Sequence, residues 1–230
     1  MRSYRDIFPG RHTFLAVIHV DHERQTLDNI AIAQDNGAGG VFLINHSIRV
    51  EALLHIYEVA HRQFPSFWMG LNMLGSSPLE ALGCIPSTAA GLWVDNAGVD
   101  DSGVSSDAQN FSSARRASQH WRGLLFGGIA FKHQPKVIDP AQAARAAIPH
   151  VDIITTSGSR TGSAPDPKKI EAMRSAIGTH PLAIASGITP SNVGDYMDHA
   201  DCFLVATGIS RSFTELDPKL VRKLARALAW

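Results

Sequence analysis

The 230-residue sequence predicts a (β/α)8 TIM barrel with parallel strands, built as one domain over residues 1–230. Eight short segments are continuously apolar, which is typical of strands buried on both faces. A helix or a helix-length segment follows each of them, giving a mean repeat of about 29 residues, the size of one βα unit. Prolines at regular positions mark several of the helix starts.

The expected strands lie, in chain order, at residues 14–20, 41–45, 67–71, 91–95, 124–132, 151–156, 182–186 and 202–207. The fifth is the least regular, because Gly127 and Gly128 interrupt it. Residues 97–106 are polar and rich in glycine and serine, so we expect a long, mobile loop there.

Five of the 12 prolines directly follow a serine, threonine or aspartate. The side-chain oxygen caps a free backbone N–H, and proline has no N–H to lose at the first helical position. Helix starts are therefore predicted at Ser77-Pro78, Asp139-Pro140, Asp166-Pro167, Thr189-Pro190 and Asp217-Pro218.

The sequence disfavours several other fold and function classes. An open doubly wound sheet is the second choice, but residues 20–23 contain no GxGxxG motif. Gly-x-Ser-x-Gly and Walker A motifs are also missing. Lys and Arg number 21 against 21 Asp and Glu, so the chain offers no cationic field for nucleic acid.

The same sequence predicts a cytoplasmic protein. No apolar stretch reaches the length of a membrane span, and the N-terminal residues lead into no signal-peptide core. The two cysteines, Cys84 and Cys202, lack CxxC spacing and suit a reducing compartment. The sequence leaves open whether the protein forms a homo-oligomer, since no segment specifies an interface.

In a barrel of this kind the active site lies at the carboxyl ends of the strands. Polar and ionisable residues follow nearly every predicted strand, whereas fewer such residues precede the strands at the opposite end. Asp95, Lys132, His19 and His133 are the candidate acid–base residues, because a carboxylate, a desolvated amine and imidazoles can move protons near neutral pH. The alternative for Asp95 and Lys132 is a structural ion pair.

Further strand-end residues are candidates for binding the substrate, namely Asn45, Asn72, Asn96, Thr156 and Arg160. The loops after the last three strands predict a phosphate site, because glycines at strand ends let backbone N–H groups approach an anion. Its candidates are Ser157, Gly158, Ser186, Gly187, Thr207 and Gly208. The alternative is that these glycines only form tight turns.

Four strand-end histidines, His19, His22, His46 and His133, also invite a metal hypothesis. The spacing of His19 and His22 is not the His-x-His of metal-dependent barrel hydrolases, and no HExxH is present. We therefore predict no metal and no cofactor.

Residues 152–162, 185–193 and 200–208, with 70–74, 131–135 and 17–20, resemble the BtpA/SgcQ family. The resemblance implies a barrel of the ribulose-phosphate-binding type. It also implies a family named for a link to photosystem I biogenesis, with no settled reaction. Two acidic residues usual in the family, at the end of strand 2 and ahead of Lys132, are replaced here by Ile44-Asn45 and Ile129-Ala130.

Together these observations predict an enzyme for a small phosphorylated sugar or ribosyl phosphate, with isomerase, lyase or nucleosidase chemistry. The alternatives are a non-catalytic assembly factor on a barrel scaffold and a metal-dependent hydrolase.

Overall fold

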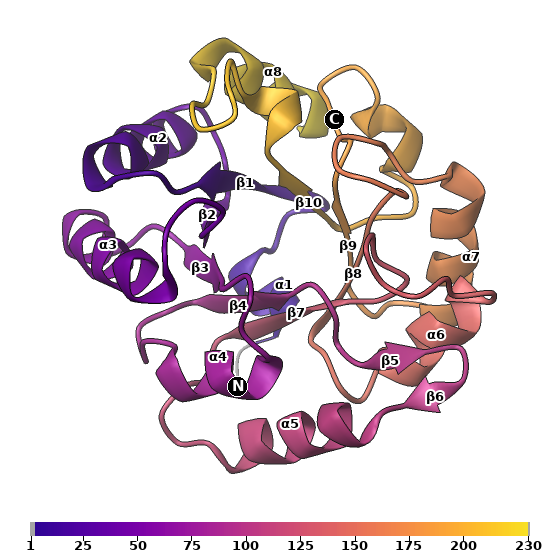
Figure 1. The fold of residues 1–230 in the computed structure, drawn as a ribbon. Helices are drawn as coiled ribbons and strands as arrows, with labels where there is room; N and C mark the ends of the chain where they lie inside the picture. The colour runs from indigo at the N-terminus through magenta and orange to yellow at the C-terminus, as the bar shows by residue number, and fades with distance from the viewer. Residues whose placement is uncertain (1–2, 230) are drawn as a thin grey trace.

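The computed structural model describes residues 3–229. Within them, eight parallel strands close into a barrel in the order β1-β10-β9-β8-β7-β4-β3-β2 (Figure 1), which confirms the predicted (β/α)8 fold. The strands are β1 Thr13–His19, β2 Gly40–Ile44, β3 Met69–Asn72, β4 Gly91–Val94, β7 Leu124–Gly128, β8 Ile153–Thr156, β9 Leu182–Ala185 and β10 Cys202–Val205.

Helices surround the barrel (Figure 1). They are α2 Glu23–Asp35, α3 Val50–Gln63, α4 Pro78–Cys84, α5 Ser106–Ala117, α6 Pro140–Ala147, α7 Pro167–Ile177 and α8 Pro218–Leu228. Four predicted helix starts are confirmed, because Ser77, Asp139, Asp166 and Asp217 each accept a backbone N–H from the first turn. None of the helices described combines the length and apolar character needed to cross a bilayer.

The helix start predicted at Thr189-Pro190 is wrong. Only a 3-10 turn forms nearby, η1 Val193–Tyr196. The Asn192 side chain folds back, accepting from Thr189 N–H at 2.8 Å and donating to Gly187 O at 2.8 Å. These side-chain bonds compete with helix formation and make a compact loop instead.

The strands are apolar on both faces because each face is buried. In β1, Leu15 and Val17 belong to the cluster inside the barrel, together with Phe42. Ala16 and Ile18, on the opposite face, belong to the cluster under the helices. This two-sided burial explains why the strand segments show no polar alternation.

The sequence did not predict the first helix, α1 Tyr4–Ile7. Figure 1 shows it at the centre of the ring of strands. Tyr4 and Phe8 are buried in the interior cluster, and the Tyr4 hydroxyl donates to Asp201 O at 2.9 Å. The helix therefore packs into the interior of the barrel at its amino-terminal end.

Residues 97–106 form a hairpin, not the predicted long loop. Strand β5 Val99–Asp100 pairs antiparallel with β6 Gly103–Val104, beside α6 (Figure 1). The Asp101 carboxylate accepts from the backbone N–H of Ile138 at 2.7 Å and of Asp139 at 2.8 Å. These bonds hold the hairpin against the start of α6.

The strand predicted over residues 124–132 ends early, at Gly128. The last pairing along it is from Ile129 N to Thr155 O at 2.8 Å. The backbone then turns away, with φ of 47° at Ala130 and 65° at His133. Lys132 and His133 therefore lie on the loop after β7. The other seven strands differ from their predicted limits by at most two residues.

Candidate functional site

A cavity of about 300 Å³ opens at the carboxyl ends of the strands. We call it the mouth cavity. Its lining is drawn from β1, β2, β4, β9 and β10 and from the loops that follow the strands, and it includes seven of the predicted site residues: His19, Asp95, Lys132, His133, Ser186, Gly187 and Thr207.

Asp95 follows β4 and is half-buried in the wall of the mouth cavity. Asn72 Nδ2 donates to its Oδ1 at 3.0 Å. Burial raises the pKa of this carboxyl, and the bond from Asn72 and the charges of Lys132 and His133 counter only part of that rise. The carboxylate is therefore a better proton acceptor than an exposed one.

Lys132 faces the same cavity, and its ammonium donates to Thr161 Oγ1 at 3.3 Å. Burial lowers the pKa of this lysine, and the charge of Asp95 acts in the opposite direction. Among the described residues, no ion pair within 4.0 Å joins Lys132 to Asp95. Both groups thus stay available to a ligand, which departs from the structural ion pair weighed above.

His19 Nδ1 is 2.9 Å from Phe213 O. A carbonyl oxygen only accepts, so Nδ1 carries the hydrogen and Nε2 of the neutral ring is an acceptor. Burial lowers the pKa of both His19 and His46, and the charge of Lys132 lowers both further. The two imidazoles are therefore neutral at pH 7.

The loop after β9 provides candidate anion donors. Gly187 has φ of 67°, and a Cβ there would lie 2.0 Å from Ala164 N, so only glycine fits. Gly162, on the loop after β8, also lines the mouth cavity. Within residues 3–229, neither the Gly162 N–H nor the Gly187 N–H donates a hydrogen bond to the chain. These two N–H groups are therefore candidate donors to a ligand in the cavity.

Three predicted phosphate residues lie outside the lining of the mouth cavity. Ser157 is buried, and its hydroxyl accepts from Lys132 N at 2.8 Å. A Cβ on Gly158 would lie 2.0 Å from Ser163 O, and one on Gly208 would lie 1.9 Å from Ile188 O. These two glycines let neighbouring loops pack closely against them.

The five predicted substrate-binding residues lie outside that lining as well. Asn45 holds the loop after β3, Thr156 is buried, and Arg160 is exposed. Asn72 contacts Asp95 directly and so positions a cavity residue. Asn96 accepts from Gly98 N–H at 2.8 Å and faces a different cavity.

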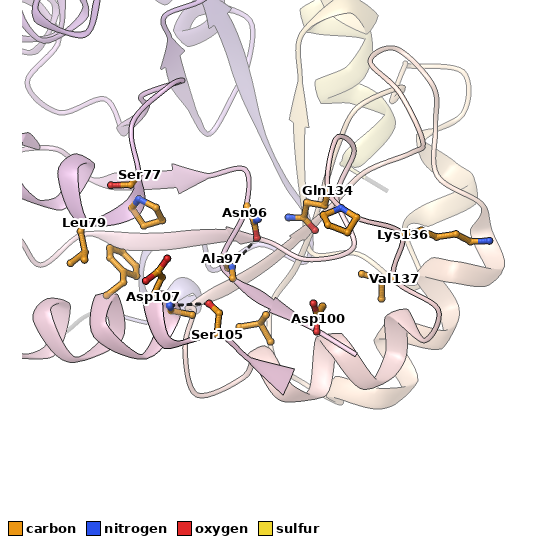
Figure 2. A pocket seen from close by; sticks show the side chains of 16 residues that line it. Ser77, Leu79, Asn96, Ala97, Asp100, Ser105, Asp107, Gln134, Lys136 and Val137 are labelled. Carbon is orange, nitrogen blue, oxygen red and sulfur yellow. Dashed lines mark hydrogen bonds between the residues drawn. The ribbon is translucent and has the colours of Figure 1, made fainter. Parts of the chain in front are cut away.

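That second cavity, of about 560 Å³, lies outside the barrel between α4, the β5–β6 hairpin, α5 and the loop before α6 (Figure 2). Leu79 and Val137 lie on opposite sides of it, and Lys136 extends away from the other labelled side chains. Gln134 Nε2 donates to Asp95 O at 2.7 Å and to Gly128 O at 3.1 Å. Gln134 therefore ties the wall of this outer cavity to the backbone of Asp95.

Sequence reasoning did not anticipate Phe213 in the mouth cavity, and it considered His46 only as a possible metal ligand. Thr161 and Gly162 lie on the loop after β8, which was expected at the phosphate, but neither was a named candidate. Phe213 carried no local signal, because it lies well beyond the end of β10.

Lys169 of α7 is a further lysine next to the site. Its ammonium donates to Ala130 O at 2.6 Å and to Ser157 O at 2.8 Å. Burial lowers its pKa to about 8. Because these two carbonyls belong to the loops after β7 and β8, Lys169 holds together the segments that carry Lys132 and Gly162.

The free energy of unfolding of the wild-type protein is expected to rise at alkaline pH because of Lys169, and replacing Lys169 by methionine should remove that rise. A lysine in the unfolded chain has a pKa near ~10.4, so between about pH 8 and 10 the unfolded state binds more protons than the folded one. In that window the wild-type free energy of unfolding should gain about 1–3 kcal/mol relative to Lys169→Met. Urea unfolding at pH 7 and pH 10 measures this, with exposed Lys168→Met as control. Parallel pH curves for wild type and Lys169→Met would contradict it.

Among residues 3–229 there is no group of three or more His, Cys, Asp or Glu side chains placed to hold a metal ion. His19 instead contacts Phe213, His46 meets the rings of both, and His22 Nδ1 accepts from Gln25 N–H.

Comparison with solved structures shows the same fold in several enzymes. A phosphoribosyl anthranilate isomerase from Thermus thermophilus has 15% sequence identity and a TM-score of 0.61, covering 94% of this chain and 98% of its own. (S)-3-O-geranylgeranylglyceryl phosphate synthase from Thermoplasma acidophilum, in complex with sn-glycerol-1-phosphate, has 11% identity and a TM-score of 0.66, covering 99% of both chains. A thiamine phosphate pyrophosphorylase from Pyrococcus furiosus has 10% identity and a TM-score of 0.63, covering 96% of this chain and 98% of its own.

A search of curated protein sequences finds no match. The model of the BtpA family matches residues 47–229. Five of the six segments that carry the resemblance lie inside that match, and residues 17–20 lie before it. The chain belongs to the BtpA family.

Proposed function

We propose that this protein is an enzyme acting on a small phosphorylated sugar or ribosyl phosphate bound in the mouth cavity. The observation that carries the proposal is the composition of that single cavity. It combines Asp95 and Lys132, unpaired with each other, with the backbone N–H groups of Gly162 and Gly187. The solved structures of the same fold include enzymes whose names and ligands contain phosphate.

The phosphate would occupy the side of the cavity formed by the loops after β8, β9 and β10. Gly162, Ser186, Gly187 and Thr207 line that side. Backbone N–H groups bind an anion without any net cationic charge, which agrees with a chain of zero net charge. Lys132, at the same cavity, adds one nearby cation.

Asp95 and Lys132 would perform the chemistry. In an isomerisation, the Asp95 carboxylate would take a proton from the hydroxyl-bearing carbon and return it to the neighbouring carbonyl carbon, while the hydroxyl proton moves to the former carbonyl oxygen. The Lys132 ammonium would stabilise the negative charge that develops on that carbonyl oxygen before it is protonated. His19 Nε2, as an acceptor, suits contact with a sugar hydroxyl. Lyase or nucleosidase chemistry would use the same residues on a different bond.

An assembly factor has no need of a desolvated carboxylate and amine in an open cavity, so this arrangement favours the enzyme. Thermal-shift screening of phosphorylated sugars against their unphosphorylated parents tests the proposal. A phosphorylated sugar present at a free concentration of 100 times its Kd stabilises the folded state by about 2.7 kcal/mol. If no phosphorylated sugar shifts Tm more than its parent sugar does, the proposal is wrong.

A further inference from the structure

Phe213 is an exposed phenyl group on the rim of the mouth cavity. Its relative exposure is 53%, and Leu79 and Ile138 are the other large hydrophobic residues exposed in the described chain. Its ring stacks on His19, with centroids 4.1 Å apart and planes 30° apart. His46 meets both rings edge-on, at 4.8 Å from His19 and 5.5 Å from Phe213. We call these three residues the aromatic patch.

The backbone around Phe213 is fixed by residues remote in sequence. Phe213 O accepts from His19 Nδ1 at 2.9 Å. The next carbonyl, Thr214 O, accepts from Asn29 Nδ2 at 2.7 Å and also from Gln25 Nε2. These bonds join the loop after β10 to β1 and α2. The exposed ring is therefore held in one place over the cavity.

The aromatic patch is electrically neutral at pH 7, because burial and the charge of Lys132 lower the pKa of both histidines. It therefore suits a flat, uncharged ring. Aromatic side chains stack on planar ligands at roughly 1–3 kcal/mol per ring. The same cavity holds the anion donors Gly162 and Gly187 and the acid–base pair Asp95 and Lys132.

We propose that the aromatic patch binds a planar aromatic or heteroaromatic ring of the substrate. The substrate class is thereby narrowed to sugar phosphates that carry such a ring. This inference rests on the proposed function, since it takes the phosphate to sit at Gly162 and Gly187. Its own basis is the fixed, exposed stack of Phe213 on His19.

Calorimetric titration with two probes tests the inference. Adenosine 5′-monophosphate carries the ring and ribose 5-phosphate lacks it. Wild type should bind the nucleotide about ten- to a hundredfold more tightly. Phe213→Ala should remove most of that advantage and leave the affinity for ribose 5-phosphate within twofold. Phe213→Trp should retain the advantage, and Phe213→Leu should lose it while keeping an apolar side chain.

Leu79→Ala, at another exposed apolar residue that lines the outer cavity, is the matched control and should change neither affinity. Equal binding of the two probes to wild type, or a nucleotide advantage that survives in Phe213→Ala, would overturn the inference and leave the proposed function standing. Binding of neither probe would overturn both.

Discussion

Replacing Asp95 by asparagine is expected to raise Tm at pH 7 while lowering turnover about 100- to 10,000-fold. Burial raises the pKa of Asp95 above that of an unfolded aspartate. The folded state therefore binds more protons than the unfolded state between the two pKa values, and the stability this gives is lost as pH rises through the folded pKa. At neutral pH the ionised carboxylate destabilises the fold, and an amide of the same shape relieves that cost.

Asp152→Asn is the matched control for this experiment. Asp152 pairs with Arg115 and accepts from Leu125 N–H at 2.7 Å, so its carboxylate supports the fold. Its substitution should lower Tm and leave the turnover of folded protein unchanged. If Asp95→Asn lowers Tm as Asp152→Asn does and keeps the activity, Asp95 is a structural residue and its proposed role is wrong.

Replacing Thr207 by glutamate is expected to weaken ribose 5-phosphate binding about 100-fold. Thr207 is exposed, lines the mouth cavity and opens the 3-10 turn η2 Thr207–Ile209 after β10. A carboxylate there would lie on the side of the cavity proposed for the phosphate. Repulsion between two like unit charges about 6 Å apart is of order 3 kcal/mol at an effective dielectric constant near 20. Calorimetric titration measures the change in affinity.

Ser159→Glu adds the same charge at an exposed residue outside the mouth cavity. Its effect on affinity should stay within a fewfold, since solvent and salt screen a surface charge. Equal losses in Thr207→Glu and Ser159→Glu would show that only net charge matters. An unchanged affinity in Thr207→Glu would place the phosphate elsewhere.

The barrel could be predicted because its signals are local. Strands buried on both faces are continuously apolar, and Ser77, Asp139, Asp166 and Asp217 cap their helices through adjacent backbone groups. Thr189-Pro190 has the same local pattern and failed, because Asn192 bonds to the loop and replaces the helix. A cap pattern does not reveal a competing side chain three residues later.

The lining of the mouth cavity could be predicted in part for the same reason. Asp95 and Ser186 directly follow β4 and β9, so an assignment of strands was enough to place them. Phe213 is held at the cavity by hydrogen bonds to distant residues. Its carbonyl accepts from His19, and the carbonyl of the next residue, Thr214, accepts from Asn29. Both donors lie more than 180 residues earlier in the chain. Contacts of that separation leave no periodic trace in the chain. The close packing of Gly158 and Gly208 against other loops is equally invisible to spacing.

The most direct test of the central claim is an NMR titration of the wild-type protein with ribose 5-phosphate, followed at the glycine amide resonances. The account predicts that the amide signals of Gly162 and Gly187 shift as phosphate binds, since both residues line the mouth cavity and neither N–H donates to an acceptor in the described chain. The amide signal of Gly98, which lines the outer cavity, should not shift. Shifts at Gly98 with none at Gly162 and Gly187 would contradict a phosphate site at the mouth of the barrel.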